Sequence, residues 1–363
     1  MRGLCAAVLM GLAAAANAAA AGPHAVALMY HHVGDGEYPS TNVTVEQFRR
    51  HLDYLANHGY HVLPLARIVN AIRGGQPLPD HAVAITFDDA YASVFETAYP
   101  LLRRRGWPFT VFVSTHVVGG GNFMTWAQMR QMAAHGATFA NHSDTHDHLI
   151  RRRPGESAEA WRKRVSGDIQ KAQTLLERHL GDSVADAPKM LAYPFGEYNA
   201  ALADWAAGAG YVAFGQESGA LGPHTDWRAA PRYPINEHYA AMDSFTTKVE
   251  SLPLHVTQEE PFDPVVQSEN PPALEVTLAS RPAHWKQLSC YLGGRRIPVA
   301  WVSRRRFRVQ PGQPLSVGRS RYNCTVPADG RYRWYSHPWI VPERELRQTS
   351  APADPASGKA DAE

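Results

Sequence analysis

Apolar and polar positions follow one repeating order through roughly the first two thirds of the chain. From Ala25 to about Thr247, an amphipathic helix, a glycine and a short apolar strand recur. The unit is seen at residues 57–63, 105–113, 135–140 and 209–214. Glycine just past a helix end accepts the left-handed conformation that closes the last turn. Because strands alternate with helices, the pattern predicts a parallel sheet, as either a barrel or a doubly wound layer.

Two of the helices can be placed from their own residues. Thr44 and Gln47, three residues apart, form a capping box. The apolar positions that follow share one helical face: Phe48, Leu52 and Leu55. A longer apolar stripe extends over residues 161–180 and is closed by Gly181. We therefore expect one helix after Thr44 and a second, longer one before Gly181.

The pattern changes after about Pro261. Four prolines between residues 261 and 272 indicate a linker, and short strand-like runs separated by turn signals follow. These runs are residues 274–278, 288–292, 297–302 and 307–309. They predict a small β-sandwich over residues 261–342, preceded by an α/β domain over residues 22–260. Residues 343–363 are polar and rich in Ala and Pro, which predicts a disordered tail.

The first residues are typical of an export signal. A positive start at Arg2 is followed by an apolar run from Leu4 to Ala16 and by the small-x-small site Ala16-Asn17-Ala18. We expect a signal peptide over residues 1–21 and an exported protein, periplasmic or secreted. The alternative interpretation is a buried N-terminal helix. No later apolar run approaches the roughly 20 residues that span a bilayer, which argues against an integral membrane protein.

The composition of the 363 residues, with 44% hydrophobic and 19% charged residues, is ordinary for a globular protein. Three cysteines are too few for a disulfide-dense small fold. Cys5 falls inside the expected signal peptide, which leaves Cys290 and Cys324 as an even pair. In an exported chain these two either form a disulfide or are buried free thiols, and the sequence leaves both alternatives open.

The net charge of +2 hides an asymmetry. Residues 262–342 carry 12 Lys and Arg against 4 Asp and Glu, together with many aromatic residues. One hypothesis is a structural module packed on the α/β domain. The other is an exposed cationic patch, formed by Arg304-Arg305-Arg306 with Arg319 and Arg321, that attracts anionic envelope glycans or lipid headgroups. Nucleic acid is not expected as a partner of an exported protein.

Two neighbouring carboxylates, Asp88 and Asp89, follow the apolar run 83–87. Side by side at the end of a buried strand they repel each other and lose hydration. A cation or a shared proton would resolve that conflict, whereas a helix cap, the alternative interpretation, would need only one of them. The pair therefore favours a metal or a proton-transfer site.

His142 and His146 lie just after the predicted strand 137–140. A spacing of four residues lets both imidazoles reach one point, and neutral imidazole is a preferred ligand for zinc and similar ions. With one Asp they would form a His-His-carboxylate set that leaves a position open for activating water. The pattern is thus typical of a metal-dependent hydrolase.

Two further segments occupy equivalent places. His31-His32 follows the run 25–30, and Pro194-Phe195-Gly196 follows the run 189–193. All four groups therefore lie at the carboxyl ends of predicted parallel strands, where barrels and open sheets build their active sites. This convergence predicts one site made from all four segments.

Three motifs together resemble those of a known family: Thr86-Phe87-Asp88-Asp89, His142-Ser143-x-x-His146 and Tyr193-Pro194-Phe195-Gly196. They resemble the polysaccharide deacetylases of carbohydrate esterase family 4, which share the NodB-homology fold. The resemblance covers about Ala25 to Thr247. It implies an α/β fold, a distorted (β/α) barrel of the NodB-homology type, that holds one divalent metal ion. The metal is usually zinc, with cobalt, nickel and iron as alternatives.

The resemblance also implies a role for individual residues. Asp89, His142 and His146 would ligate the metal, and Asp88 would be the general base. The backbone N–H of Phe195 would help to stabilise the oxyanion. The function implied is removal of N-acetyl groups from a GlcNAc-containing polysaccharide. The alternatives are peptidoglycan N-deacetylation, another carbohydrate deacetylation, and a non-catalytic glycan-binding envelope protein.

The general acid is assigned from a finer resemblance. Met29-Tyr30-His31 is similar to the branch that deacetylates poly-N-acetylglucosamine, in which a permuted barrel places this acid on its N-terminal strand. We therefore expect His31 to be the acid, with His32 and His255 as rivals. His255 follows a leucine, as in the usual late motif of the family, but stands at the edge of the expected linker.

Four residues are expected to bind substrate: Tyr193, Pro194, Trp227 and Arg232. Tyr193 and Pro194 belong to the third motif, and Trp227 faintly resembles a groove motif of the family. Many members carry an arginine oriented toward the base where this chain has Ala192. We expect Arg232 to take the place of that arginine.

Overall fold

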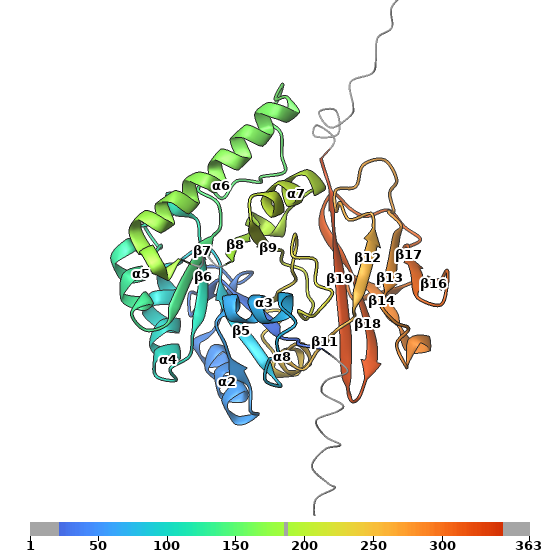
Figure 1. Ribbon diagram of the computed structural model, residues 1–363, viewed down its shortest axis with the longest axis horizontal. Coiled ribbons are helices and arrows are strands. Elements are labelled where there is room, and N and C mark those ends of the chain that lie inside the picture. Colours follow the sequence, from blue (N-terminus) through green and yellow to red (C-terminus); the bar gives the residue numbers. More distant parts are fainter. Residues whose placement is uncertain (1–21, 185–187, 344–363) are drawn as a thin grey trace, which may run out of the picture.

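The computed structural model describes residues 22–184 and 188–343, so the predicted signal peptide and tail lie outside the described residues. An α/β domain and a β domain lie side by side (Figure 1). Within the described residues, no helix combines the length and the apolar character needed to cross a membrane.

The α/β domain is built on one parallel sheet with the strand order β10-β1-β5-β6-β7-β8-β9, and β4 pairs with β5. The strands are β1 (Val26–Tyr30), β4 (His61–Val62), β5 (Ala82–Phe87), β6 (Phe109–Val113), β7 (Ala137–Asn141), β8 (Lys189–Ala192), β9 (Tyr211–Phe214) and β10 (Tyr233–Pro234). Backbone hydrogen bonds join Ala213 and Gly215 to Ala230, close to β10. The sheet is thus a distorted, incomplete barrel, as expected from the family resemblance.

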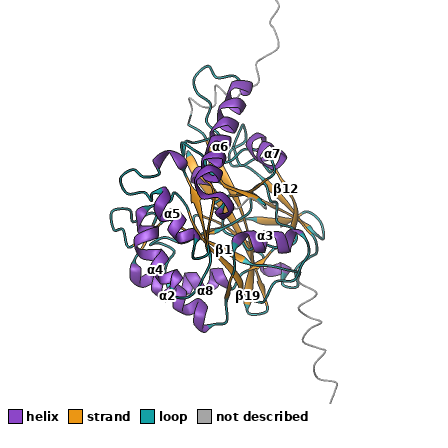
Figure 2. Ribbon diagram, turned by 60° about the vertical axis from the view of Figure 1, so that its left-hand side comes forward, coloured by secondary structure: helices purple, strands orange, loops and turns teal. Residues whose placement is uncertain are grey.

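Helices cover this sheet (Figure 2). They are α2 (Val45–Asn57), α3 (Leu65–Arg73), α4 (Tyr99–Arg103), α5 (Trp126–Ala133), α6 (Ala158–Leu180), α7 (Ala200–Gly208) and α8 (Met242–Val249). The predicted capping box is present, because Gln47 N–H donates to Thr44 Oγ1 and the Gln47 side chain accepts from Thr44 N–H. The predicted stripe over 161–180 is the buried face of α6, which Gly181 ends with a φ of 51°.

The β domain has two facing sheets, β11-β19-β18-β14-β15 and β12-β13-β17-β16. Their strands are β11 (Leu252–Pro253), β12 (Val256–Glu260), β13 (Leu274–Leu278), β14 (Ser289–Leu292), β15 (Arg295–Ile297), β16 (Val299–Trp301), β17 (Arg306–Val309), β18 (Gly318–Ala328) and β19 (Arg331–Val341). Their side chains enclose a separate hydrophobic core. Cys290 and Cys324 face each other across β14 and β18 and are joined by a disulfide.

The boundary between the domains differs from the expected one. β11 pairs with β19, and β12 pairs with β13, so the second domain begins near residue 252 rather than 261. The prolines that we interpreted as a linker belong to the connection between β12 and β13. Proline is common in such connections, and its presence alone does not separate a linker from a loop within a domain.

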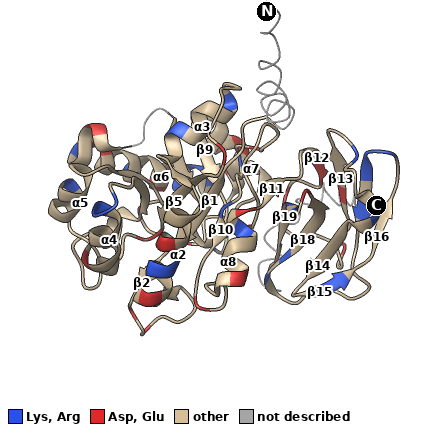
Figure 3. Cartoon of the chain, turned by 90° about the horizontal axis from the view of Figure 1, so that it is seen from below, with Lys and Arg blue, Asp and Glu red and all other residues tan. Residues whose placement is uncertain are grey.

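The expected cationic patch is also divided. Arg304, Arg305 and Arg306 are exposed where β17 begins, in the four-stranded sheet. Arg319 and Arg321 lie on β18 in the other sheet, and each donates to a backbone carbonyl of the α/β domain. Lys and Arg positions, coloured blue on the ribbon, accordingly occur both near β15 and β16 and close to the boundary between the domains (Figure 3). The five arginines therefore do not form one surface.

Candidate active site

The four predicted segments meet at the carboxyl ends of their strands. His31 follows β1, Asp89 follows β5, His146 lies in the loop after β7, and Phe195 lies in the loop after β8. All four line one cavity of about 480 Å³. The cavity arises because neighbouring parallel strands deliver their following loops to the same rim of the sheet.

Asp89, His142 and His146 form a compact group of ligand atoms. Asp89 Oδ1 is 3.1 Å from His142 Nε2 and 3.1 Å from His146 Nε2. Asp89 Oδ1 and His142 Nε2 are both buried, yet neither has a hydrogen-bond partner among the described residues. Buried polar atoms are seldom left without a hydrogen-bond partner. Three such ligand atoms, each with a lone pair and close to one another, can bind a cation between them. The residues present therefore suit a divalent metal ion.

The orientation of His142 supports the same conclusion. Its Nδ1 lies 2.8 Å from the backbone carbonyl of Ala192 at the end of β8. A carbonyl only accepts, so Nδ1 carries the proton and Nε2 keeps its lone pair for a ligand bond. The main chain thus sets the tautomer that a metal ligand requires.

Left-handed backbone conformations are concentrated in these loops. Asp89, Ser143, His146 and Phe195 have φ values of 70°, 65°, 56° and 60°. Each such conformation costs of the order of 1–3 kcal/mol for a residue other than glycine, and the surrounding structure must maintain it. In the 142–146 loop, Ser143 helps to do so, since its Oγ accepts from the backbone N–H of His146.

Asp88 has a different environment from Asp89. Its two oxygens accept from Nη1 and Nη2 of Arg232 at 2.6 and 2.8 Å, and both side chains are fully buried. Arg232 also donates to the carbonyl of Gly215 and to Thr86 Oγ1. The structure therefore places Arg232 against the expected base, the position that we assigned to the arginine missing at Ala192.

These contacts set the protonation of both carboxylates. Burial acts to raise the pKa of Asp88, but the charges of Arg232 and His142 outweigh it, so the pKa of Asp88 lies below its ordinary value. Burial also acts to raise the pKa of Asp89, and the adjacent rings of His142 and His146 hold that pKa well below its usual range. Both groups are therefore ionised at neutral pH.

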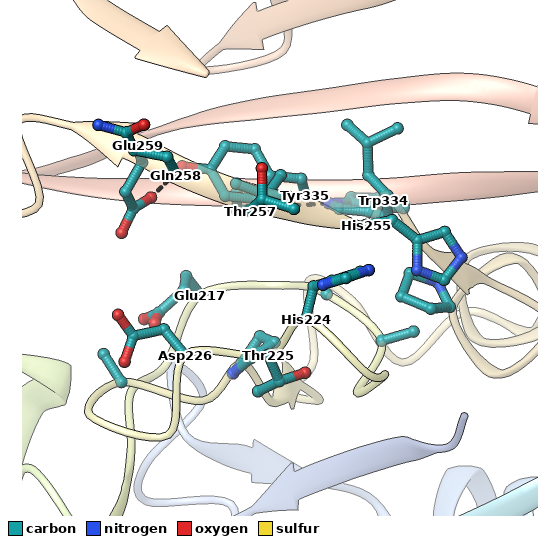
Figure 4. A pocket seen from close by; sticks show the side chains of 18 of the residues that line it. Glu217, His224, Thr225, Asp226, His255, Thr257, Gln258, Glu259, Trp334 and Tyr335 are labelled. Carbon is teal, nitrogen blue, oxygen red and sulfur yellow. Dashed lines mark hydrogen bonds between the residues drawn. The ribbon is translucent and has the colours of Figure 1, made fainter. Parts of the chain in front are cut away.

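The three histidines considered as the acid occupy different places. His31 lines the cavity, and its Nε2 is 4.0 Å from Asp89 Oδ2. His32 is buried, with its ring stacked between Tyr38 and Tyr91. His255 lies opposite His224 in a separate pocket of about 130 Å³ between the domains (Figure 4). His31 alone of the three lines the cavity that contains Asp89 and His146.

The expected substrate contacts are corrected by the structure. Tyr193, Pro194 and Arg232 are buried, and the Tyr193 hydroxyl donates to the carbonyl of Arg228. Trp227 packs against the core on the α3 side of the sheet. Of these four residues, none lines the cavity. Arg232 instead holds Asp88, and of the third motif only Phe195 and Gly196 line the cavity.

Sequence reasoning missed the place of four charged residues at the site. Glu197 is buried and its Oε2 is 2.7 Å from His148 Nδ1. Glu217 is buried beside the cavity, and burial raises its pKa to about 8. Arg319 and Arg321 reach the same cavity from the second domain. Glu197 stands two residues after Phe195 and could have been suspected from that spacing, whereas no local signal marks the other three.

Comparisons with known proteins agree with this geometry. Residues 75–214 match the polysaccharide deacetylase family. The matched segment lies within the α/β domain and contains Asp88, Asp89, His142, His146 and Phe195. A poly-beta-1,6-N-acetyl-D-glucosamine N-deacetylase of Escherichia coli is 27% identical over 211 residues, which cover 48% of this chain and 31% of that protein. The enzyme of the same name from Staphylococcus aureus is 25% identical over 177 residues, covering 47% and 59%.

The α/β domain also resembles solved structures. The Streptococcus pyogenes deacetylase PplD aligns with a TM-score of 0.55 and 21% identity, over 63% of this chain and 99% of that one. At that identity the likeness concerns the fold. The chain spans less than two thirds of the length of the two curated relatives named above. The β domain lies outside the residues that match the family.

Proposed function

We propose that the protein is a metal-dependent N-deacetylase that removes acetyl groups from a GlcNAc-containing polysaccharide. The observation that carries the proposal is the pairing of two differently held carboxylates. Asp89 belongs to a three-residue ligand group, and Asp88 is held beside it by Arg232. This division provides a ligand and a separate base, as amide hydrolysis requires.

The residues divide the chemistry between them. A bound divalent ion, which we expect to be zinc, would polarise the acetamide carbonyl and lower the pKa of the attacking water. Asp88 takes the proton of that water, and Arg232 keeps it ionised for the purpose. The Phe195 N–H donates to the oxyanion as it develops. His31 then protonates the leaving amine, and the products are acetate and a free amino sugar.

The finer parts of the proposal have separate support. The names of the two curated relatives and the placement of His31 favour a poly-N-acetylglucosamine-like substrate. The N-terminal sequence and the Cys290–Cys324 disulfide favour an exported protein, periplasmic or secreted. The exposed group Arg304-Arg305-Arg306 would attract an anionic envelope surface weakly and in a salt-dependent way.

Acetate release from N-acetylchitopentaose, measured with each divalent metal and with a chelator, tests the proposal. D89N and H142A should lose both bound metal and activity. D88N should keep the metal, and its rate should fall about 10²–10⁴-fold, the usual effect of removing a general base. D182N, which removes an exposed carboxylate, is the matched control. Metal binding to the three ligands without acetate release from any N-acetylated glycan would instead favour the non-catalytic glycan-binding alternative.

A further inference from the structure

Two arginines of the second domain reach into the catalytic cavity. Arg319 and Arg321 lie on β18, and alternation along the strand points both side chains to the face that meets the deacetylase domain. Arg319 Nη1 donates to the carbonyl of Phe195 at 2.5 Å. Arg321 Nη1 donates to the carbonyl of Gln216 at 3.1 Å. The second domain thus contacts the loops that follow β8 and β9.

Arg319 is held on several sides. Its Nε lies 3.7 Å from Glu197 Oε1, and Glu197 Oε2 lies 2.7 Å from His148 Nδ1. The ring of His148 stacks on the ring of Phe195 at 4.0 Å, and the Arg319 guanidinium lies 5.6 Å from the same ring. Phe195 is therefore fixed through its carbonyl and through its side chain by one connected group of residues.

The loop that contains Phe195 has an unfavourable backbone conformation. Phe195 adopts a φ of 60°, which is unfavourable for a residue with a side chain. The adjacent Gly196 also has a positive φ, and a Cβ at Gly196 would meet the Gln216 side chain at 2.8 Å. The loops after β8 and β9 therefore interlock, and Arg319 and Arg321 each anchor one of them.

We propose that Arg319 is a positioning residue that holds Phe195 so that its backbone N–H faces the developing oxyanion. The proposal rests on the proposed function, in which that N–H is the oxyanion donor. Such a donor contributes mainly in the transition state, so its misplacement lowers kcat more than it alters KM. The second domain therefore contributes a residue to the catalytic site, in addition to any role in binding the cell envelope.

The test replaces Arg319 by Met, which keeps the length of the side chain and removes its charge and donors. R319M should lower kcat on N-acetylchitopentaose by about tenfold to a hundredfold, a fraction of the effect of deleting an oxyanion donor. KM and bound metal should stay near the wild-type values. R319K, which keeps a charge and a donor, should recover part of kcat. R308M, which changes an exposed arginine of the same domain, is the control.

A second measurement does not depend on activity. Amide hydrogen exchange of residues 193–199 should be faster in R319M than in wild type and unchanged in R308M. Unchanged exchange in R319M would overturn the anchoring, and faster exchange with an unchanged kcat would overturn its role in positioning. If R319M fails to fold, E197Q loosens Arg319 from the other side, and the same two outcomes apply. A wild-type protein that releases no acetate refutes the proposed function, while the exchange measurement still decides the anchoring.

Discussion

Replacing Arg232 by Met tests the arrangement around the expected base. The substitution leaves Asp88 fully buried without the two hydrogen bonds that it accepts from the guanidinium. Breaking a buried ion pair by removing one partner costs about 3–5 kcal/mol, because the other charge stays buried and uncompensated. The carbonyl of Gly215 and Thr86 Oγ1 also lose a donor, which places the expected loss toward the upper end.

The same substitution should change the pH dependence. In the wild type the pKa of Asp88 lies below its ordinary value, so its stabilising charge is present above the unfolded pKa of about 3.9. That stability is lost as the pH falls through the still lower folded pKa. Without Arg232, the effect of burial dominates and raises the pKa of Asp88. The acid limb of kcat/KM should then move to higher pH, because the base is protonated over a wider range.

Urea unfolding of both proteins, at one metal concentration and at neutral pH, measures the first effect, and the pH profile of kcat/KM measures the second. The double variant R232M/D88N should recover most of the lost stability without recovering activity, because it removes the uncompensated charge together with the base. A loss below about 1 kcal/mol in R232M, with an unmoved acid limb, would show that the ion pair does not control Asp88.

Three further predictions test other parts of the molecule. H31A should lower kcat about 10²–10⁴-fold with metal content intact, whereas H255A should leave both unchanged; the reverse result would restore a late histidine as the acid. Burial raises the pKa of Glu217 from 4.5 to about 8, so its neutral form stabilises the fold at low pH and this stability is lost as the pH rises from about 4.5 through 8. E217Q should therefore melt at a higher temperature than wild type at pH 9 and show no such gain at pH 4, and identical curves would refute this. C290S/C324S should unfold in urea with about 3–4 kcal/mol less stability than the oxidised wild type, because the substitution opens a 34-residue loop, and chemically reduced wild type should lose the same amount.

The parts of the site that follow strands could be predicted from the sequence. Asp89, His142 and Phe195 each follow an apolar strand, and parallel strands carry such residues to one rim whatever the details of packing. The role of Arg232 could be predicted only from the family resemblance, as a replacement for the arginine absent at Ala192. It lies 144 residues after Asp88, and no periodic pattern connects positions that far apart.

The contribution of the second domain could not be predicted. Its docking depends on contacts such as the edge-to-face pair of Tyr233 and Trp334, which join surfaces distant in the sequence. Only that docking brings Arg319 to the cavity, so the strand pattern of β18 carries no sign of its role. For the same reason the disulfide stayed one of two alternatives until the register of β14 and β18 placed Cys290 opposite Cys324.

The pairing of β11 with β19 has a consequence for the order in which the chain folds. β11 follows α8, the last helix of the α/β domain, and its partner strand comes some 80 residues later. Contacts between segments this far apart form slowly, because closing a long loop costs conformational entropy before the new contacts can compensate it. During synthesis the N-terminal α/β domain is completed first and can fold early. The loop that contains Phe195 then lacks its contact with Arg319 until the hairpin of β18 and β19 has been synthesised and has docked. Catalytic competence is thus expected to be the last property that the folding chain acquires.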